Sequence, residues 1–171
     1  MLIRILGSAA GGGFPQWNCA CPNCEGVRHG RPGLRRRTQD SIAVSADGSD
    51  WFLFNASPDL LHQLTAAPAL WPRAPRHTPL AGILLGNGDL DHVLGLFSLR
   101  ESQPLVLYAT SAVRRGLERN VIFRTLQRFP EQVSGSVGFG GEKVIGAVYI
   151  HWSADFAKQV AAGMLGFALE E

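Results

Sequence analysis

The stretch that decides the fold reads Ala81-Gly82-Ile83-Leu84-Leu85-Gly86-Asn87-Gly88-Asp89-Leu90-Asp91-His92. Its first part, 81–85, is a short apolar run, which is typical of a buried strand. Its second part is rich in glycine and carboxylates, and a predicted helix follows to about residue 100. A strand that passes through a polar loop into a helix is the connection at which α/β sheets usually place functional side chains.

The rest of the chain repeats this alternation of strands and helices, which favours the α/β class. Asp47-Gly48 supplies turn chemistry for a hairpin, and Ser57 is expected to cap a short helix with Pro58 at its first position. Beyond Pro130 the pattern weakens, and 144–151 and 164–169 are candidate strands. The other expected strands are 2–6, 41–45, 51–55 and 105–109, and the other expected helix is 111–120.

Composition limits the class of protein. The 171 residues suffice for one domain with a sizeable core, and a net charge of +2 is too small to argue for nucleic acid. No apolar run approaches the length of a membrane span. Residues 1–6, interrupted by Arg4, indicate a strand rather than a signal peptide. Together with unpaired thiols, this predicts a cytoplasmic protein.

All three cysteines, Cys19, Cys21 and Cys24, form a C-x-C-x2-C cluster directly after the glycine-rich loop 7–13. Three thiolates so close in sequence can converge on one tetrahedral ion, most commonly Zn²⁺. The fourth ligand is open: His29 is the nearest candidate, and a distant residue is an equal alternative. The other interpretation is three reduced cysteines without metal.

A second candidate metal site lies in the loop after the strand 81–85. Asp89, Asp91 and His92 place two carboxylates and an imidazole within four residues, a set that can bind a divalent metal through oxygen and nitrogen. The alternative is structural: Asp91 caps the helix, Asp89 is solvated and His92 packs.

Basic residues are concentrated between residues 28 and 37. This segment is either a surface that attracts a carboxylate or phosphate ligand or a solvated, mobile loop. The residues are Arg28, Arg31, Arg35, Arg36 and Arg37.

Longer motifs carry a resemblance to a known family. They occupy 6–19, 37–45, 55–59, 88–96 and 99–101. In these stretches the chain resembles the coenzyme PQQ synthesis protein B family, part of the metallo-β-lactamase-like superfamily, most strongly over 1–123. The resemblance implies an αββα sandwich. Because the family is longer, we expect 1–171 to be a single partial domain with the first half of that fold and a divergent end.

The resemblance also assigns chemistry to the second candidate site. The superfamily motif H-x-H-x-D-H corresponds to Asn87, Asp89, Asp91 and His92, so the first two histidines are replaced. This oxygen-rich set suits Fe²⁺ or Mn²⁺ better than a zinc hydroxide. By resemblance, Asp89, Asp91 and His92 would hold a catalytic Fe²⁺ and the cysteines a structural zinc. His151, the only later histidine, is a candidate substitute ligand.

The function implied is biosynthesis of pyrroloquinoline quinone (PQQ), by metal-dependent oxidation or hydroxylation of a glutamate–tyrosine-derived precursor. That precursor is rich in carboxylates, so Arg35, Arg36 and Arg37 become candidate docking residues. Ser57 and Asp59 are candidates at the same edge, although they also fit a helix cap and a first-turn acid.

Two alternatives stay open: a non-catalytic carrier for PQQ or its precursor, and a metallo-hydrolase, against which the missing histidines count. Other PQQ biosynthesis proteins are expected partners, and a homodimer is open.

Overall fold

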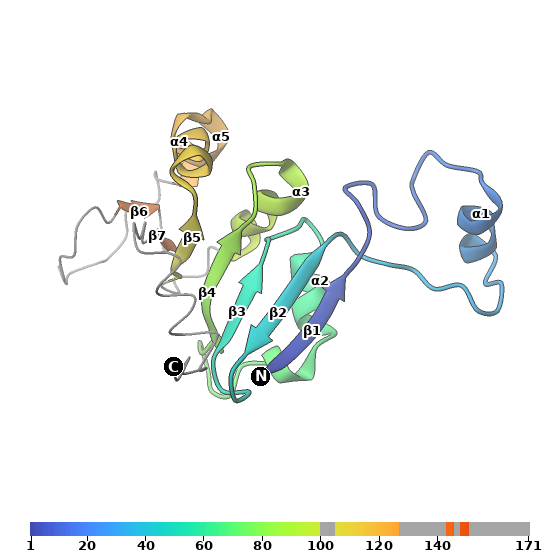
Figure 1. The fold of residues 1–171 in the computed structure, drawn as a ribbon, viewed down its shortest axis with the longest axis horizontal. Helices are drawn as coiled ribbons and strands as arrows, with labels where there is room; N and C mark the ends of the chain where they lie inside the picture. The colour runs from blue at the N-terminus through green and yellow to red at the C-terminus, as the bar shows by residue number, and fades with distance from the viewer. Residues whose placement is uncertain (100–104, 127–142, 146–147, 151–171) are drawn as a thin grey trace, which may run out of the picture.

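A five-stranded mixed sheet forms the centre of the protein (Figure 1). The computed structural model describes residues 1–99, 105–126, 143–145 and 148–150. The sheet has the order β1-β2-β3-β4-β5; β2 is antiparallel to β1 and β3, whereas β3, β4 and β5 run parallel. The α/β class and the expected strands at 2–6, 41–45, 51–55, 81–85 and 105–109 are confirmed, the last of them shorter than expected. The strands are β1 Leu2–Gly7, β2 Ser41–Ser45, β3 Trp51–Phe54, β4 Leu80–Leu85 and β5 Leu107–Ala109.

Short helices connect and cover these strands. Two of them, α1 and α5, had no clear sequence signal, since each is only two turns or fewer in length. The predicted helix after β4 forms as one α-helical turn, α3, continued as the 3₁₀ segment η2. The helices are α1 Pro22–Arg28, α2 Leu60–Thr65, η1 Pro68–Leu70, α3 Leu90–Val93, η2 Leu94–Leu99, α4 Ser111–Arg119 and α5 Val121–Leu126.

The candidate strand 144–151 is instead a small antiparallel pair, β6 Lys143–Ile145 with β7 Val148–Ile150. The candidate strand 164–169 and His151 lie outside the described residues.

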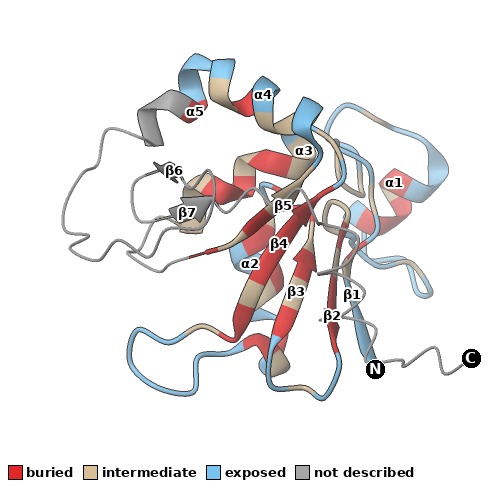
Figure 2. Ribbon diagram, turned by 60° about the vertical axis from the view of Figure 1, so that its left-hand side comes forward, coloured by how far each residue is buried: buried red, intermediate tan, exposed pale blue. Residues whose placement is uncertain are grey.

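The main core lies on the face of the sheet that α2 covers (Figures 1 and 2). Side chains alternate between the two faces of a strand, so Leu53, Ile83 and Leu107 enter this core and are fully buried. The opposite face carries Val44 and Leu84 with half-buried neighbours. At the edge strand β1 that face is open, because the side chain of Ile5 is 72% exposed. Both faces of the sheet are therefore apolar.

The start of α2 differs from its prediction. The helix begins at Leu60 with Asp59 as N-cap residue, and no side chain caps it. Ser57, the predicted cap, is fully buried and donates a hydrogen bond to Gln63 Oε1 over 3.2 Å. The Asp59 carboxylate accepts from Gln39 N over 3.0 Å. The predicted cap at Ser57 is wrong because Gln63, farther along α2, takes the Ser57 hydroxyl, while Gln39 takes the Asp59 carboxylate.

Residues 8–37 form an arm that leaves the sheet after β1, carries α1 at its far end and returns before β2 (Figure 1). The backbone amides of Ser8 and Ala9 donate to Thr38 O over 3.0 and 2.9 Å, which closes the base of the arm. The approach requires glycine at position 7: a Cβ there would lie 1.9 Å from Gln39 O. Over the residues described, no helix is both long and apolar enough to cross a bilayer.

Two isoleucines of the sheet test which face carries the stability. Ile83→Ala removes a fully buried side chain and should lower the free energy of unfolding by about 2–5 kcal/mol. Ile5→Ala, at a 72% exposed position, should change it by no more than about 0.5 kcal/mol. Urea denaturation measures both, and equal losses would contradict this assignment of the core.

Candidate functional site

Asn55 joins the carboxyl ends of two parallel strands. It follows β3 in a left-handed backbone conformation with a φ of 61°, and its backbone amide donates to Leu84 O over 2.8 Å. Its side-chain Oδ1 accepts from Gly86 N over 3.0 Å, and its Nδ2 donates to Asp40 Oδ2 over 3.1 Å. Since Asn55 is only 8% exposed, these bonds fix the loop after β4 relative to the loop after β3.

The same edge holds the turn from Asn87 to His92. The His92 carbonyl accepts from Ala56 N over 2.7 Å, so α3 is tied to the residue after Asn55. Asn87 Nδ2 donates to Asp89 Oδ2 over 2.9 Å, and Asn87 Oδ1 accepts from Asp89 N over 2.9 Å. These two bonds define which end of the Asn87 amide is the oxygen.

That assignment determines the chemistry of His92. Its Nδ1 lies 2.6 Å from Asn87 Oδ1, and because this oxygen only accepts, Nδ1 must donate. In a neutral His92 the free lone pair is therefore on Nε2, which leaves that nitrogen available as a metal ligand.

The glycine-rich loop passes directly over Asp91. A Cβ placed on Gly11 would lie 3.1 Å from Asp91 Oδ2, so two stretches eighty residues apart in sequence meet here. Beneath the loop, Gln39 donates from Nε2 to Gly11 O. The buried Gln39 Oε1 has no hydrogen-bond partner among the residues described.

The structure does not gather Asp89, Asp91 and His92 into one compact ligand group; in the described part of the chain only the cysteines form such a group. The reason is local geometry. Asp89 precedes α3 and is turned toward Asn87, whereas Asp91 lies on the helix, and residues two apart there point in different directions. Asp91 and His92 remain candidate metal ligands, adjacent to each other in the sequence.

The three cysteines do converge. The sulfur atoms of Cys19, Cys21 and Cys24 all lie within 4.8 Å of one another, and Cys24 is buried while Cys21 is exposed. This arrangement is the one that the C-x-C-x2-C spacing predicts, and it fits a tetrahedral Zn²⁺ with one further ligand.

The thiol groups differ in acidity. A hydrogen bond from the Cys24 backbone has the largest effect and one with the Cys19 thiol the second largest; together they lower the pKa of Cys21 to about 7. A backbone hydrogen bond at Gln16 lowers the pKa of Cys24, but burial and the other two thiol groups outweigh it and raise that pKa above its usual value. Cys21 is thus more readily available as a thiolate near neutral pH than Cys24.

Arg28 anchors the cysteine loop to α1. Its guanidinium donates to the carbonyl oxygens of Gln16 and Cys19 and to Glu25 Oε1, the last over 2.7 Å. His29, the nearest predicted fourth ligand, is not part of the group: it ends α1, and its Nδ1 lies 2.9 Å from Glu25 O.

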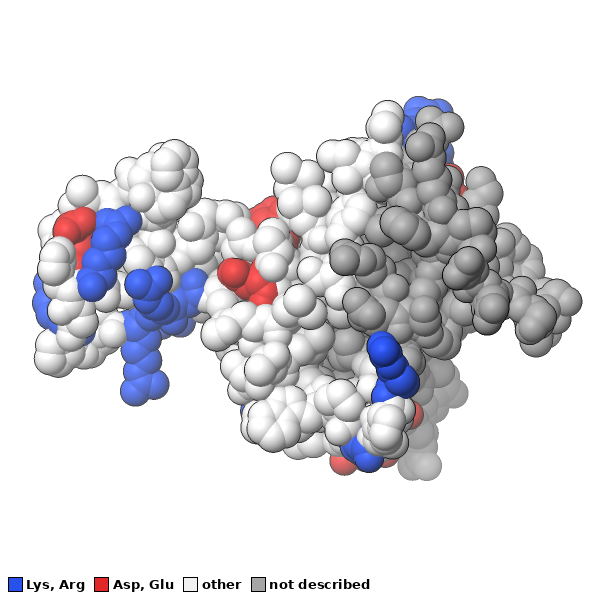
Figure 3. All heavy atoms as spheres, turned by 180° about the vertical axis from the view of Figure 1, so that it is seen from behind, with Lys and Arg blue, Asp and Glu red and all other residues white. Residues whose placement is uncertain are grey.

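Some of the predicted docking residues line a groove and others do not. Basic side chains gather over the lobe that carries α1 (Figure 3), and Arg36 and Arg37 line a groove of about 350 Å³ together with Asp59. Arg35 does not line it. Ser57 is fully buried and hydrogen-bonded to Gln63, so it is not placed to touch a ligand.

Sequence reasoning missed Asn55 and His62 as site residues, and it placed Arg28 in a ligand-attracting surface rather than against the cysteine loop. An asparagine directly after a strand, ahead of Ser-Pro-Asp, is a weak signal for a left-handed turn and could have indicated Asn55. His62 lines the same groove as Arg36 and Arg37, and a lone histidine on a short helix carries no comparable signal.

This fold belongs to a known superfamily. The family model described as "Beta-lactamase superfamily domain" matches residues 50–171. The chain belongs to the β-lactamase superfamily. A diphosphatase of the PhnP family, 22% identical with a TM-score of 0.61, covers 88% of this chain and 49% of its own; it shares the superfamily fold.

Within the superfamily the resemblance is specific. Coenzyme PQQ synthesis protein B of Methylobacterium sp. (strain 4-46) is 54% identical over 135 residues, which are 78% of this chain and 44% of that protein. A structure of Zn²⁺-bound PqqB from Methylobacterium extorquens is 52% identical with a TM-score of 0.69, covering 72% of this chain and 42% of its own. The predicted family resemblance is confirmed, and the chain spans less than half the length of these relatives.

Asn55 supplies the first test of the site. Asn55→Gly keeps the left-handed conformation but loses the bonds to Asp40 and Gly86, and should lower the free energy of unfolding by about 1–3 kcal/mol. Asn55→Ala loses the same bonds and adds the penalty of a Cβ at positive φ, so it should be less stable than the glycine variant by about 1 kcal/mol. Denaturant unfolding measures the difference. An alanine variant as stable as the glycine variant would argue against strain at this position.

Arg28 supplies a second test. Arg28→Ala frees the loop that carries Cys19 and should weaken zinc binding by about 10-fold or more, the range found for residues that orient metal ligands. Competition with a chromophoric chelator measures this affinity. Arg35→Ala, on the same arm, is the control. If both variants bind zinc as the wild type does, Arg28 has no role in holding the cysteine group.

Proposed function

We propose that this protein takes part in the biosynthesis of PQQ, through metal-dependent oxidation or hydroxylation of a glutamate–tyrosine-derived precursor. The observation that carries the proposal is the combination of 54% identity to coenzyme PQQ synthesis protein B with the meeting of its two most distinctive stretches, the glycine-rich loop and the Asp91 turn. The expected pathway partners, cytoplasmic location, homodimer and single partial domain stay predictions.

The proposal includes two metal sites, and the arrangement of the residues favours one more strongly than the other. The cysteine group fits a structural Zn²⁺, since three sulfur atoms converge and Arg28 holds their loop. An Fe²⁺ would be held by Asp91 and His92, for which the free Nε2 of His92 is suited. Asp89 would need to turn away from Asn87 to join them. When bound, such a metal supplies the redox chemistry.

The chain's own residues would orient that chemistry. Asn87 holds the His92 ring by its Nδ1, and Gly11 leaves room for the Asp91 carboxylate. Arg36 and Arg37 lie beside the same glycine-rich loop, in a groove that Gly12 and Gly13 also line. In this proposal they would bind the carboxylates of the precursor.

A non-catalytic carrier is the second candidate. The observation in its favour is that Asp89, Asp91 and His92 do not form a compact ligand group among the described residues, while the basic groove does not need a metal. Tight binding of PQQ by metal-free protein, without turnover of the precursor, would favour the carrier.

Substitution at Asp91 and His92 tests the enzymatic proposal. Asp91→Ala and His92→Ala should each lower iron content and precursor turnover. The loss should exceed about 10- to 100-fold, the range found when a residue that only orients a metal ligand is removed. Zinc content should stay unchanged, because the cysteine group lies on the arm. Elemental analysis and a turnover assay measure both quantities. The matched control is Asp50→Asn, an exposed acid beside β3. If both alanine variants retain wild-type iron and turnover, the assignment is wrong.

A further inference from the structure

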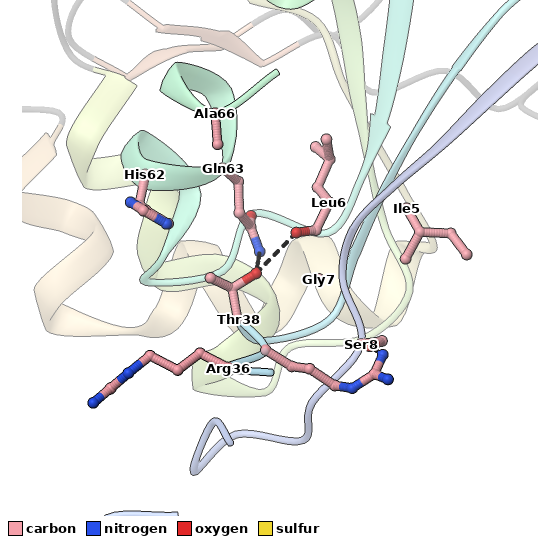
Figure 4. Close-up of a pocket in the computed structure, with 10 residues that line it drawn as sticks. Ile5, Leu6, Gly7, Ser8, Arg36, Thr38, His62, Gln63 and Ala66 are labelled. Carbon is pink, nitrogen blue, oxygen red and sulfur yellow. Dashed lines mark hydrogen bonds between the residues drawn. The ribbon is translucent and has the colours of Figure 1, made fainter. Parts of the chain in front are cut away.

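A groove at the base of the arm brings opposite charges and apolar side chains together. It measures about 350 Å³, and its lining includes Phe14, Pro15, Arg36, Arg37, Asp59 and His62. A neighbouring hollow of about 290 Å³ shares Arg36, Arg37 and His62 (Figure 4). The three basic side chains thus border two adjoining hollows, and they come from the arm and from α2.

The two arginines are not neutralised by the protein. In the described part of the chain neither Arg36 nor Arg37 forms an ion pair. Arg37 donates from Nη1 to Ser8 Oγ over 2.9 Å, which holds its guanidinium toward the start of the arm. Arg36 extends on the side of His62 (Figure 4). Most of the guanidinium donors are therefore left for a ligand.

The backbone that carries these arginines is held on both sides. Arg37 exchanges two hydrogen bonds with Phe14, over 3.0 and 2.9 Å. Next to it, Thr38 donates to Leu6 O over 2.9 Å, and Gln63 donates to Thr38 Oγ1 over 3.0 Å. Gln63 is only 2% exposed. A site on a fixed backbone loses less entropy when a ligand binds than one on a free loop.

The charges of the groove select the kind of anion. Arg36 and Arg37 contribute +2 and Asp59 contributes −1, which leaves +1 with a neutral His62. A single carboxylate neutralises that charge, whereas a phosphate monoester near −2 would leave the groove net negative and would feel about twice the repulsion from Asp59. The planar fork of an arginine also binds a carboxylate through two parallel hydrogen bonds. The half-buried Phe14 and Pro15 give the groove an apolar wall.

We propose that this groove binds the carboxylate of a small organic acid through Arg36 and Arg37, with its apolar body against Phe14 and Pro15 and His62 at its border. The inference rests on the proposed function for the identity of the natural acid, but the binding itself needs no metal. It assigns the docking role to two of the three consecutive arginines and excludes Arg35.

Titration calorimetry of the full chain with zinc bound, at constant ionic strength, tests this with 3-phenylpropionate and inorganic phosphate as probes. We expect saturable binding of 3-phenylpropionate and weaker binding of phosphate. Arg36→Ala and Arg37→Ala should each weaken the carboxylate by about 10-fold or more, the effect of removing a charge-assisted hydrogen bond. Arg35→Ala, which removes the same charge next to the groove, should weaken it by less than about twofold.

A second set of variants separates shape from charge. Arg36→Lys keeps the charge but loses the fork, so its affinity should lie between those of wild type and Arg36→Ala. An equal loss in Arg35→Ala and Arg36→Ala, tighter binding of phosphate than of the carboxylate, or no binding of either probe would overturn the proposal. Asp91→Ala should bind the probe as the wild type does. The groove can thus be confirmed while the enzymatic proposal fails, or the reverse.

Discussion

The arrangement of the candidate site depends on one side chain, Asn55. Parallel strands leave their carboxyl ends at one edge of a sheet, but the loops that follow have no reason to hold a fixed relation unless something links them. Asn55 provides that link with both ends of its amide, to Gly86 on one side and Asp40 on the other. Its left-handed backbone turns the chain sharply, so that Ala56 can bond to the His92 carbonyl. The position of α3, and with it of Asp91 and His92, follows from this network.

The arm depends on the same edge. Its base is closed by bonds to Thr38, and the close approach there leaves no room for a side chain on Gly7. From that base the glycine-rich loop runs over Asp91 on one side and borders the arginine groove on the other. One loop therefore separates the two places where ligands are proposed, while the cysteine group lies farther out, beside α1. A metal held by the cysteines would order the arm without reaching the sheet edge.

Much of the fold could be predicted from the sequence, because the signals for it are local. The apolar runs at 41–45 and 81–85 became strands with the expected bounds to within one residue, and the cysteine spacing brought three sulfur atoms together. The failures occurred where a side chain took a hydrogen-bond partner other than the one that its local pattern suggested. Ser57 and Asp59 have the composition of a helix start, but Gln63 and Gln39 take their side chains. Asp89, Asp91 and His92 are close in sequence, yet Asn87 draws Asp89 away.

The sequence by itself determined the α/β class, the family resemblance and the convergence of the three cysteines, since these follow from side-chain period and from spacing over a few residues. Only the tertiary structure decided which of three consecutive arginines border a groove, and that Gly11 lies against Asp91. It also decided which nitrogen of His92 is free. The first two depend on contacts between segments far apart in the chain, such as Arg37 with Ser8 and with Phe14, and the third depends on the fold of the Asn87 turn. Long-range contacts of this kind leave no periodic trace in the sequence, because they are set by how the arm folds back on itself at the edge of the sheet.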